Sequence, residues 1–201
     1  MISAGNDIVA LDVVDKQRTI QPRFYSKILS LSEQTLYRED IYELSFERYV
    51  WLLWSIKEAV YKYGQRLEPG LVFSPLKIVI QELKGTAPCC GVVRSGSCIL
   101  YSRSTIHDRF ISTVVSSDPQ FEGVRAGVAP IDSTDRDAQS ASVRALLFDK
   151  LYSLLPAGGG DLRVDKRPDG CPLLYQGEEK MNIPVSLAHH GHFVAYSFRL
   201  D

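Results

Sequence analysis

The sequence predicts an α+β fold built from two similar halves. Helix-like segments are interleaved with short strands that are joined mostly by hairpin turns, an order typical of this class. Residues 117–140 are rich in Asp, Ser and Gly and interrupt this order, and afterwards the pattern of one helix followed by strands begins again. We therefore divide the chain into a half at residues 1–116, a linker at 117–140 and a half at 141–201.

The elements of the first half follow from hydrophobic spacing and from turn residues. Strands are expected at residues 8–13, 76–83, 91–101 and 109–116. Short helices are expected at residues 23–29 and 32–38, the second with Ser32 as a possible N-cap. In the strand at 76–83, apolar residues alternate with polar ones, which indicates one buried face.

The central helix of the first half is predicted to run from Ser45 to Tyr63 and to end at Gly64 as a left-handed cap. Apolar residues recur at steps of three and four on one face, and tryptophans mark a second face, so the helix is expected to be central. Lys57, Glu58 and Lys62 nevertheless lie near its core-facing end. Charges in such a position are normally paired, bound to metal or exposed in a cleft.

Two interpretations of these charges remain open on residue types alone. Glu58 and Lys62 are one helical turn apart and can address one site together. They can equally form an i,i+4 salt bridge on a solvent-exposed face of the helix, which is a common and weak interaction.

The second half is predicted from a similar pattern. An amphipathic helix is expected at residues 142–155, followed by strands at 162–164, 173–175, 184–188 and 192–198. Within the linker, residues 124–128 have the pattern of a short edge strand.

Composition excludes several classes of protein. A formal net charge of -1 gives no signal of nucleic-acid or membrane-surface binding. The sequence has no apolar run long enough to span a membrane and no secretory signal, so we expect a cytoplasmic protein. The four cysteines do not have the spacing of zinc-ligand pairs and are expected to be reduced thiols.

Three motifs stand out in this chain. Gly5-Asn6-Asp7-Ile8 opens the first strand, Trp54-Ser55-Ile56-Lys57-Glu58-Ala59-Val60-Tyr61-Lys62 lies in the central helix, and Val185-Ser186-Leu187-Ala188-His189-His190 lies in a late strand. Together they resemble the three signatures of the 4'-phosphopantetheinyl transferase superfamily: G-x-D-[IV], W-x-x-K-E-[AS]-x-x-K, and a strand with S-L-S-H or N-I-S-H. The central motif matches at every defining position.

The order of the motifs bears on the architecture that the resemblance implies. In the surfactin-type enzymes two related halves form a pseudodimer, and the half with the histidine strand comes first. Here it comes second, so the chain resembles a circular permutant of that type and is expected to be a monomer. The alternative is the short domain of the trimeric holo-acyl-carrier-protein synthases with a long insertion.

The resemblance implies an enzyme that transfers the 4'-phosphopantetheine arm of coenzyme A to a serine of an acyl or peptidyl carrier protein. It implies Mg²⁺ held by Asp7 and Glu58, with Glu58, Lys62 and Lys57 as catalytic residues. Glu58 is the candidate to accept the serine proton, and Lys62 to balance phosphate charge. Lys57 matches the family lysine, although its role is equally explained by pairing with a carboxylate. For Asp7 alone, a turn residue capping its own backbone is the alternative.

The coenzyme A phosphates are expected to contact residues of the second half. Arg144 aligns with the arginine of the family motif, and His189 with the family histidine that contacts the 3'-phosphate. Further cations are offered by Arg163, Lys166 and Arg167.

Two departures from the family pattern favour a second hypothesis. Cys171 replaces a lysine and Ala188 a serine, and each replacement is expected to remove one phosphate contact. The chain would then be a weakened relative that binds coenzyme A or carrier protein without efficient transfer. A third hypothesis, a zinc hydrolase at His189, His190 and His192, is less favoured because adjacent strand residues point to opposite sides.

Overall fold

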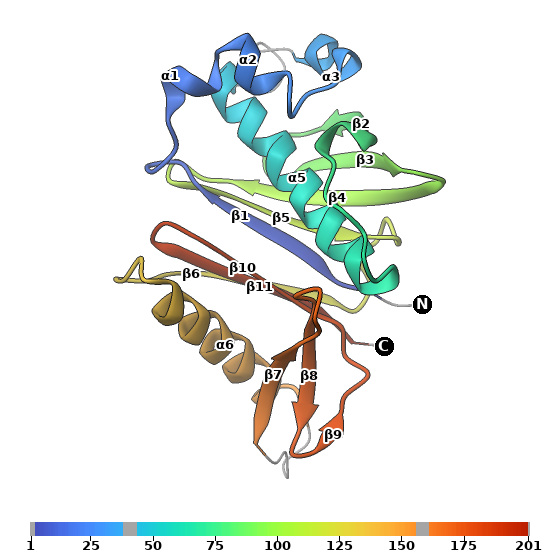
Figure 1. Ribbon diagram of the computed structural model, residues 1–201, viewed down its shortest axis with the longest axis vertical. Helices are drawn as coiled ribbons and strands as arrows, with labels where there is room; N and C mark the ends of the chain where they lie inside the picture. The colour runs from blue at the N-terminus through green and yellow to red at the C-terminus, as the bar shows by residue number, and fades with distance from the viewer. Residues whose placement is uncertain (1–2, 38–43, 156–160, 201) are drawn as a thin grey trace.

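The computed structural model of the protein describes residues 3–37, 44–155 and 161–200. The predicted α+β class is confirmed: two long helices each cover a separate antiparallel sheet, and a small third sheet flanks the second one (Figure 1). No helix in the described ranges is long and apolar enough to cross a membrane.

The first sheet has the strand order β1-β5-β4-β3-β2, and all its strands are antiparallel. Its strands are β1 (Gly5–Ala10), β2 (Ile78–Lys84), β3 (Cys89–Ser95), β4 (Cys98–Ile106) and β5 (Phe110–Ser116). The single strand predicted at 91–101 is wrong, because Gly96 has a φ of 58° and forms the turn between β3 and β4. Strand β2 begins only after η1 (Pro75–Lys77), a turn of 3-10 helix.

Helix α5 (Phe46–Leu67) lies across this sheet, and its core-facing side chains are fully buried (Figure 1). Its N-terminal end is covered by α1 (Lys16–Thr19), α2 (Pro22–Tyr25) and α3 (Leu31–Leu36). The cap of α3 is Ser30, not Ser32, because Ser30 and Glu33 bond reciprocally to each other's backbone amides in a capping box. Arg38, the last residue of the predicted helix, lies outside the described residues.

Helix α5 continues past Gly64, so the predicted cap at that residue is wrong. The extra turn carries Gln65 and Arg66, whose side chains bond to backbone carbonyls of the second half. These tertiary bonds stabilise a helical turn that local sequence alone does not favour after glycine.

The second sheet has the order β10-β11-β6, and the third has the order β7-β8-β9. Their strands are β6 (Val124–Pro130), β7 (Leu162–Lys166), β8 (Pro172–Gln176), β9 (Glu179–Lys180), β10 (Val185–His190) and β11 (Phe193–Arg199). The edge strand predicted inside the linker is confirmed as β6. Helix α6 (Arg136–Tyr152) begins earlier than predicted, because Asp135 accepts hydrogen bonds from the amides of Asp137 and Ala138 as its N-cap.

The second sheet packs against β1 on the side of β1 that faces away from α5. Ile8 and Ala10 of β1 form a small apolar core with Ala188, Phe193 and Ala195. Strand β1 is also an edge strand, and side chains of β10 bond to its free amides. The amide of Asn6 donates to Ser186 Oγ at 3.1 Å, and that of Ala10 donates to His190 Nδ1 at 2.9 Å.

Candidate functional site

Asp7 lies in the middle of β1 and faces α5. Gly5, on the same face, is in close contact with that helix: a Cβ atom at Gly5 would be 2.2 Å from the carbonyl oxygen of Ala59. Glycine at this position therefore lets β1 approach α5 closely enough for the Asp7 carboxylate to reach the helix. Because Asp7 is a strand residue paired with Thr113, the alternative of a turn residue capping its own backbone is wrong.

Lys62 and Asp7 form an ion pair between α5 and β1, with 3.0 Å between Lys62 Nζ and Asp7 Oδ1. Lys62 thus pairs with the strand carboxylate, and the described residues show no ion pair between Lys62 and Glu58. The second oxygen, Asp7 Oδ2, is buried and has no hydrogen-bond partner in the described chain. A buried carboxylate oxygen without a partner is costly, and a cation would compensate for it.

Glu58 lies beside this ion pair, one turn before Lys62. Burial raises the pKa of Glu58 above its ordinary value; the Lys62 charge lowers it in part, and the Asp7 charge raises it further. The Asp7 charge therefore reaches Glu58, which is consistent with two carboxylates at one site.

The donor set fits magnesium better than zinc. Mg²⁺ commonly takes only one or two protein carboxylates and completes its octahedron with waters and phosphate oxygens. Asp7 and Glu58 offer two hard oxygen ligands. Within the described ranges, no three His, Cys, Asp or Glu side chains converge into a set that could hold a metal.

Lys57 lies in the core, whereas Lys62 is partly exposed. Its Nζ donates to Glu33 Oε2 at 2.7 Å and to the carbonyl oxygen of Ile28 at 2.6 Å, and neither side chain of the Lys57–Glu33 pair is exposed to solvent. Glu33 also accepts the amide of Ile80. The structure therefore gives Lys57 the second of its two expected roles, pairing with a carboxylate, and places it away from Asp7.

The three histidines of the late strand diverge. His190 accepts the amide of Ala10, so its Nδ1 carries no proton, and burial lowers its pKa. His192 Nδ1 lies 3.1 Å from the carbonyl oxygen of Ile131. His189 is exposed on the other side of β10. This geometry contradicts a zinc site built from the three.

Several positive charges act on His189. Burial of part of its ring lowers the pKa of His189, and the charges of Lys62, Arg136 and Lys166 lower it further. Lys62 comes from the first half and the other two from the second, so charges of both halves act on this histidine. The sequence interpretation missed Arg136, which lies in the first turn of α6, because residues 117–140 were assigned to the linker. Asp135 was the available signal, because an aspartate at this position can cap a helix that begins at Arg136.

The remaining cations that were predicted to bind phosphate differ in whether their charged groups already have partners in the protein. Arg163 pairs with Asp165 and Glu178 and lies over the Tyr175 ring, 4.3 Å from its centroid. Lys166 is exposed. Arg144 is partly buried in α6, and its Nε has no hydrogen-bond partner among the described residues.

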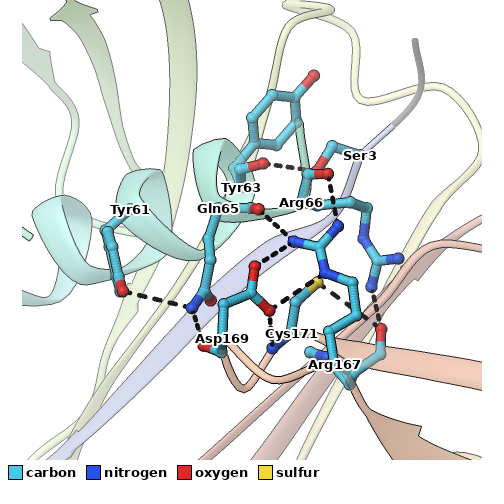
Figure 2. Close-up of polar contacts among 9 residues, drawn as sticks. Ser3, Tyr61, Tyr63, Gln65, Arg66, Arg167, Asp169 and Cys171 are labelled. Carbon is cyan, nitrogen blue, oxygen red and sulfur yellow. Dashed lines mark hydrogen bonds and ion pairs between the residues drawn. The ribbon is translucent and has the colours of Figure 1, made fainter. Parts of the chain in front are cut away.

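Arg167 binds the end of α5 rather than facing solvent (Figure 2). Its guanidinium donates to the carbonyl oxygens of Gln65 and Arg66 and forms a two-pronged ion pair with Asp169, with Arg167 Nη2 2.6 Å from Asp169 Oδ2. Carbonyls at the end of a helix lack partners and carry partial negative charge, so this arginine caps α5. Gln65 completes the contact by donating to the carbonyl oxygen of Asp169.

Both departures from the family pattern lie inside the protein. Cys171 is buried next to the Arg167–Asp169 ion pair, and burial raises the pKa of its thiol. Ala188 packs against β1 between the sheets. Both side chains are almost fully buried among other protein residues.

One of three comparisons with known proteins identifies a family. A sequence model of the 4'-phosphopantetheinyl transferase superfamily matches residues 3–115, which include Asp7, Glu58 and Lys62 and all of the first sheet but the last residue of β5. No curated protein and no solved structure gives a significant match. Because the matched segment covers more than half of the 201 residues, the chain belongs to the 4'-phosphopantetheinyl transferase superfamily.

Proposed function

We propose that this protein transfers the 4'-phosphopantetheine arm of coenzyme A to a serine of an acyl or peptidyl carrier protein and releases adenosine 3',5'-bisphosphate. The observation that carries the proposal is the convergence of Asp7, Glu58 and Lys62 from two elements of the family-matched segment, with a buried carboxylate oxygen left unpartnered. Family membership supports phosphopantetheine transfer in general.

Asp7 and Glu58 are the residues that would hold Mg²⁺. When bound, the ion would neutralise charge on the pyrophosphate of coenzyme A. Positioning and charge neutralisation account for most of catalysis in phosphoryl transfer. The raised pKa of Glu58 suits a general base for the serine hydroxyl, because the carboxylate then accepts a proton more readily. Lys62, held in place by Asp7, would stabilise negative charge on the phosphate as the bridging bond breaks.

His189 and its neighbouring cations are proposed to bind the nucleotide end of coenzyme A. The charges of Lys166 and Arg136 act on His189, and the Arg144 guanidinium has one nitrogen without a hydrogen-bond partner in the described part of the chain. Arg163 and Arg167 are less suited to this role, because their guanidinium groups already bind carboxylates of the protein.

A permuted pseudodimer is the architecture that we propose for these two halves. Each long helix covers its own sheet, and the cations around His189 come from both halves of one chain. Such a site needs no second subunit, so light scattering should give the mass of a monomer. A trimer would favour the short synthase domain with an insertion.

The decisive experiment is the labelling of a panel of apo-carrier proteins with fluorescent coenzyme A, with and without Mg²⁺. Label that depends on Mg²⁺ and disappears in an Asp7→Asn variant supports the proposal. The second candidate is a weakened relative that only binds its substrates, and it is motivated by Cys171 and Ala188. Calorimetry that shows coenzyme A binding while every carrier stays unlabelled would favour that candidate.

A further inference from the structure

A cavity of about 850 Å³ lies on the side of α5 that faces away from the two carboxylates. It is bounded by the C-terminal half of α5, by residues 68–77 and by the turn between β3 and β4. The segment from α5 to β2 runs back along the helix (Figure 1). Its residues line one side of the cavity. Leu67 follows Glu58 by about two and a half helical turns and therefore projects from the opposite side of α5.

The lining of this cavity is apolar to an extent unusual for a surface. Buried side chains such as Val60 and Leu100 contribute to it. Four of the large apolar side chains that the described chain leaves exposed also line it: Leu67, Val72, Leu76 and Ile99. Val72 is 80% exposed, which is costly for an apolar residue that has no partner. Clustered exposure of this kind marks a binding surface.

The charged residues of the lining favour an anionic ligand. Lys77 and Arg94 both line the cavity, and neither has an ion pair within the described ranges. Arg94 lies opposite Val79 in the β2–β3 ladder, and Lys77 is the last residue of η1, directly before β2. Among the lining residues, all of them described, Glu68 is the only acid.

We propose that this cavity binds an amphiphile with an aliphatic or aromatic body and an anionic head group. Its volume lies in the range of cavities that enclose small ligands, and its apolar lining with a few polar groups is typical of them. The apolar body would contact the exposed residues of α5 and of the following segment, and the head group would pair with Lys77 and Arg94. This site does not depend on the proposed transferase function.

Calorimetric titration with three C12 probes tests the proposal: dodecanoate and dodecyltrimethylammonium below their micelle concentrations, and dodecan-1-ol below its solubility limit. Dodecanoate should bind most tightly, and Lys77→Glu and Arg94→Glu should each weaken it roughly tenfold. Lys84→Glu, an exposed lysine of β2 outside the cavity, is the matched control and should change nothing. Equal affinity for all three probes, or equal loss in the control, would overturn the proposal.

A thiol at the cavity provides an independent readout. Cys98 lines the cavity and is exposed, whereas Cys90 is exposed outside it. Dodecanoate should slow the reaction of Cys98 with a disulfide reagent in a Cys90→Ser variant, and should leave Cys90 unaffected in a Cys98→Ser variant. Protection of both thiols or of neither contradicts the site. A dimer in solution that Leu67→Glu dissociates would show instead that a second copy fills the cavity.

Discussion

Lys57 and Lys62 lie on the same helix, in the same motif, and their surroundings differ sharply. Lys57 is fully buried and bonded to Glu33 and to a carbonyl oxygen, whereas the Lys62–Asp7 pair is partly exposed beside a second carboxylate. In the core, every polar atom of the pair is satisfied. At the site, one Asp7 oxygen has no hydrogen-bond partner among the residues that the structure describes. A completed ion pair stabilises the fold, and an incomplete one leaves capacity for a ligand.

The largest expected effect comes from breaking the core pair. Lys57→Met leaves Glu33 buried without its counter-charge and should lower the free energy of unfolding by about 3–5 kcal/mol. Lys62→Met is the matched control in the same helix, and should cost less, about 1–3 kcal/mol, because Lys62 is partly exposed and its pair is not fully buried. Urea denaturation followed by circular dichroism measures both. Equal losses would mean that burial does not distinguish the two lysines.

The next effect concerns activity at the incomplete pair. Asp7→Asn should lower the turnover of carrier labelling by roughly 100- to 1000-fold, the range found when one stabilising charge interaction is removed from a phosphoryl-transfer or acyl-transfer site. Its circular dichroism spectrum should stay native. Glu58→Gln should lower turnover similarly, and should raise the melting temperature without Mg²⁺, because burial disfavours the charged carboxylate. Full activity in either variant would remove the metal assignment.

The Arg167 contact is expected to have a smaller effect, on stability. Arg167→Gln removes the cap of α5 and leaves Asp169 without its partner, which should cost about 1–3 kcal/mol of unfolding free energy. Arg163→Gln is the control, since that arginine pairs with exposed carboxylates and should change stability little. A larger loss in the control would contradict the capping role.

The smallest effect is the pH dependence of stability from His190. Folding lowers its pKa below the ordinary value of 6.5, so the unfolded chain takes up a proton first as the pH falls. The contribution to stability is therefore complete above that value and is lost as the pH falls through the lowered pKa. His190→Asn keeps an acceptor for the Ala10 amide and should flatten the decline of melting temperature below pH 6.5. An unchanged slope would assign the decline to other groups.

Periodicity and local motifs predicted the parts of the structure that depend on neighbouring residues. The apolar spacing of α5 predicted a central helix, and the G-x-D and W-x-x-K-E motifs named the residues that meet at Asp7. The N-cap of α3 could also have been predicted, because Ser30 and Glu33 have the spacing of a capping box. The prediction nevertheless placed the cap at Ser32.

Contacts between distant segments could not be predicted in the same way. Arg167 caps a helix that ends about 100 residues earlier in the chain, and nothing in its local sequence distinguishes it from a solvated arginine. The extension of α5 past Gly64 depends on the same contacts. Arg136 was missed for a local reason, since a polar first turn resembles a linker until Asp135 is recognised as its cap.

The side chains of Ser186 and His190 cover the free amides of Asn6 and Ala10 on the edge of β1, and this has a consequence for the chain as a whole. An uncovered edge strand recruits other chains and promotes aggregation. The first half expressed alone would present that edge together with the apolar surface of Ile8 and Ala10. Split into two polypeptides within residues 117–123, the protein should be recoverable only by co-expression, with each fragment acting as the solubilising partner of the other.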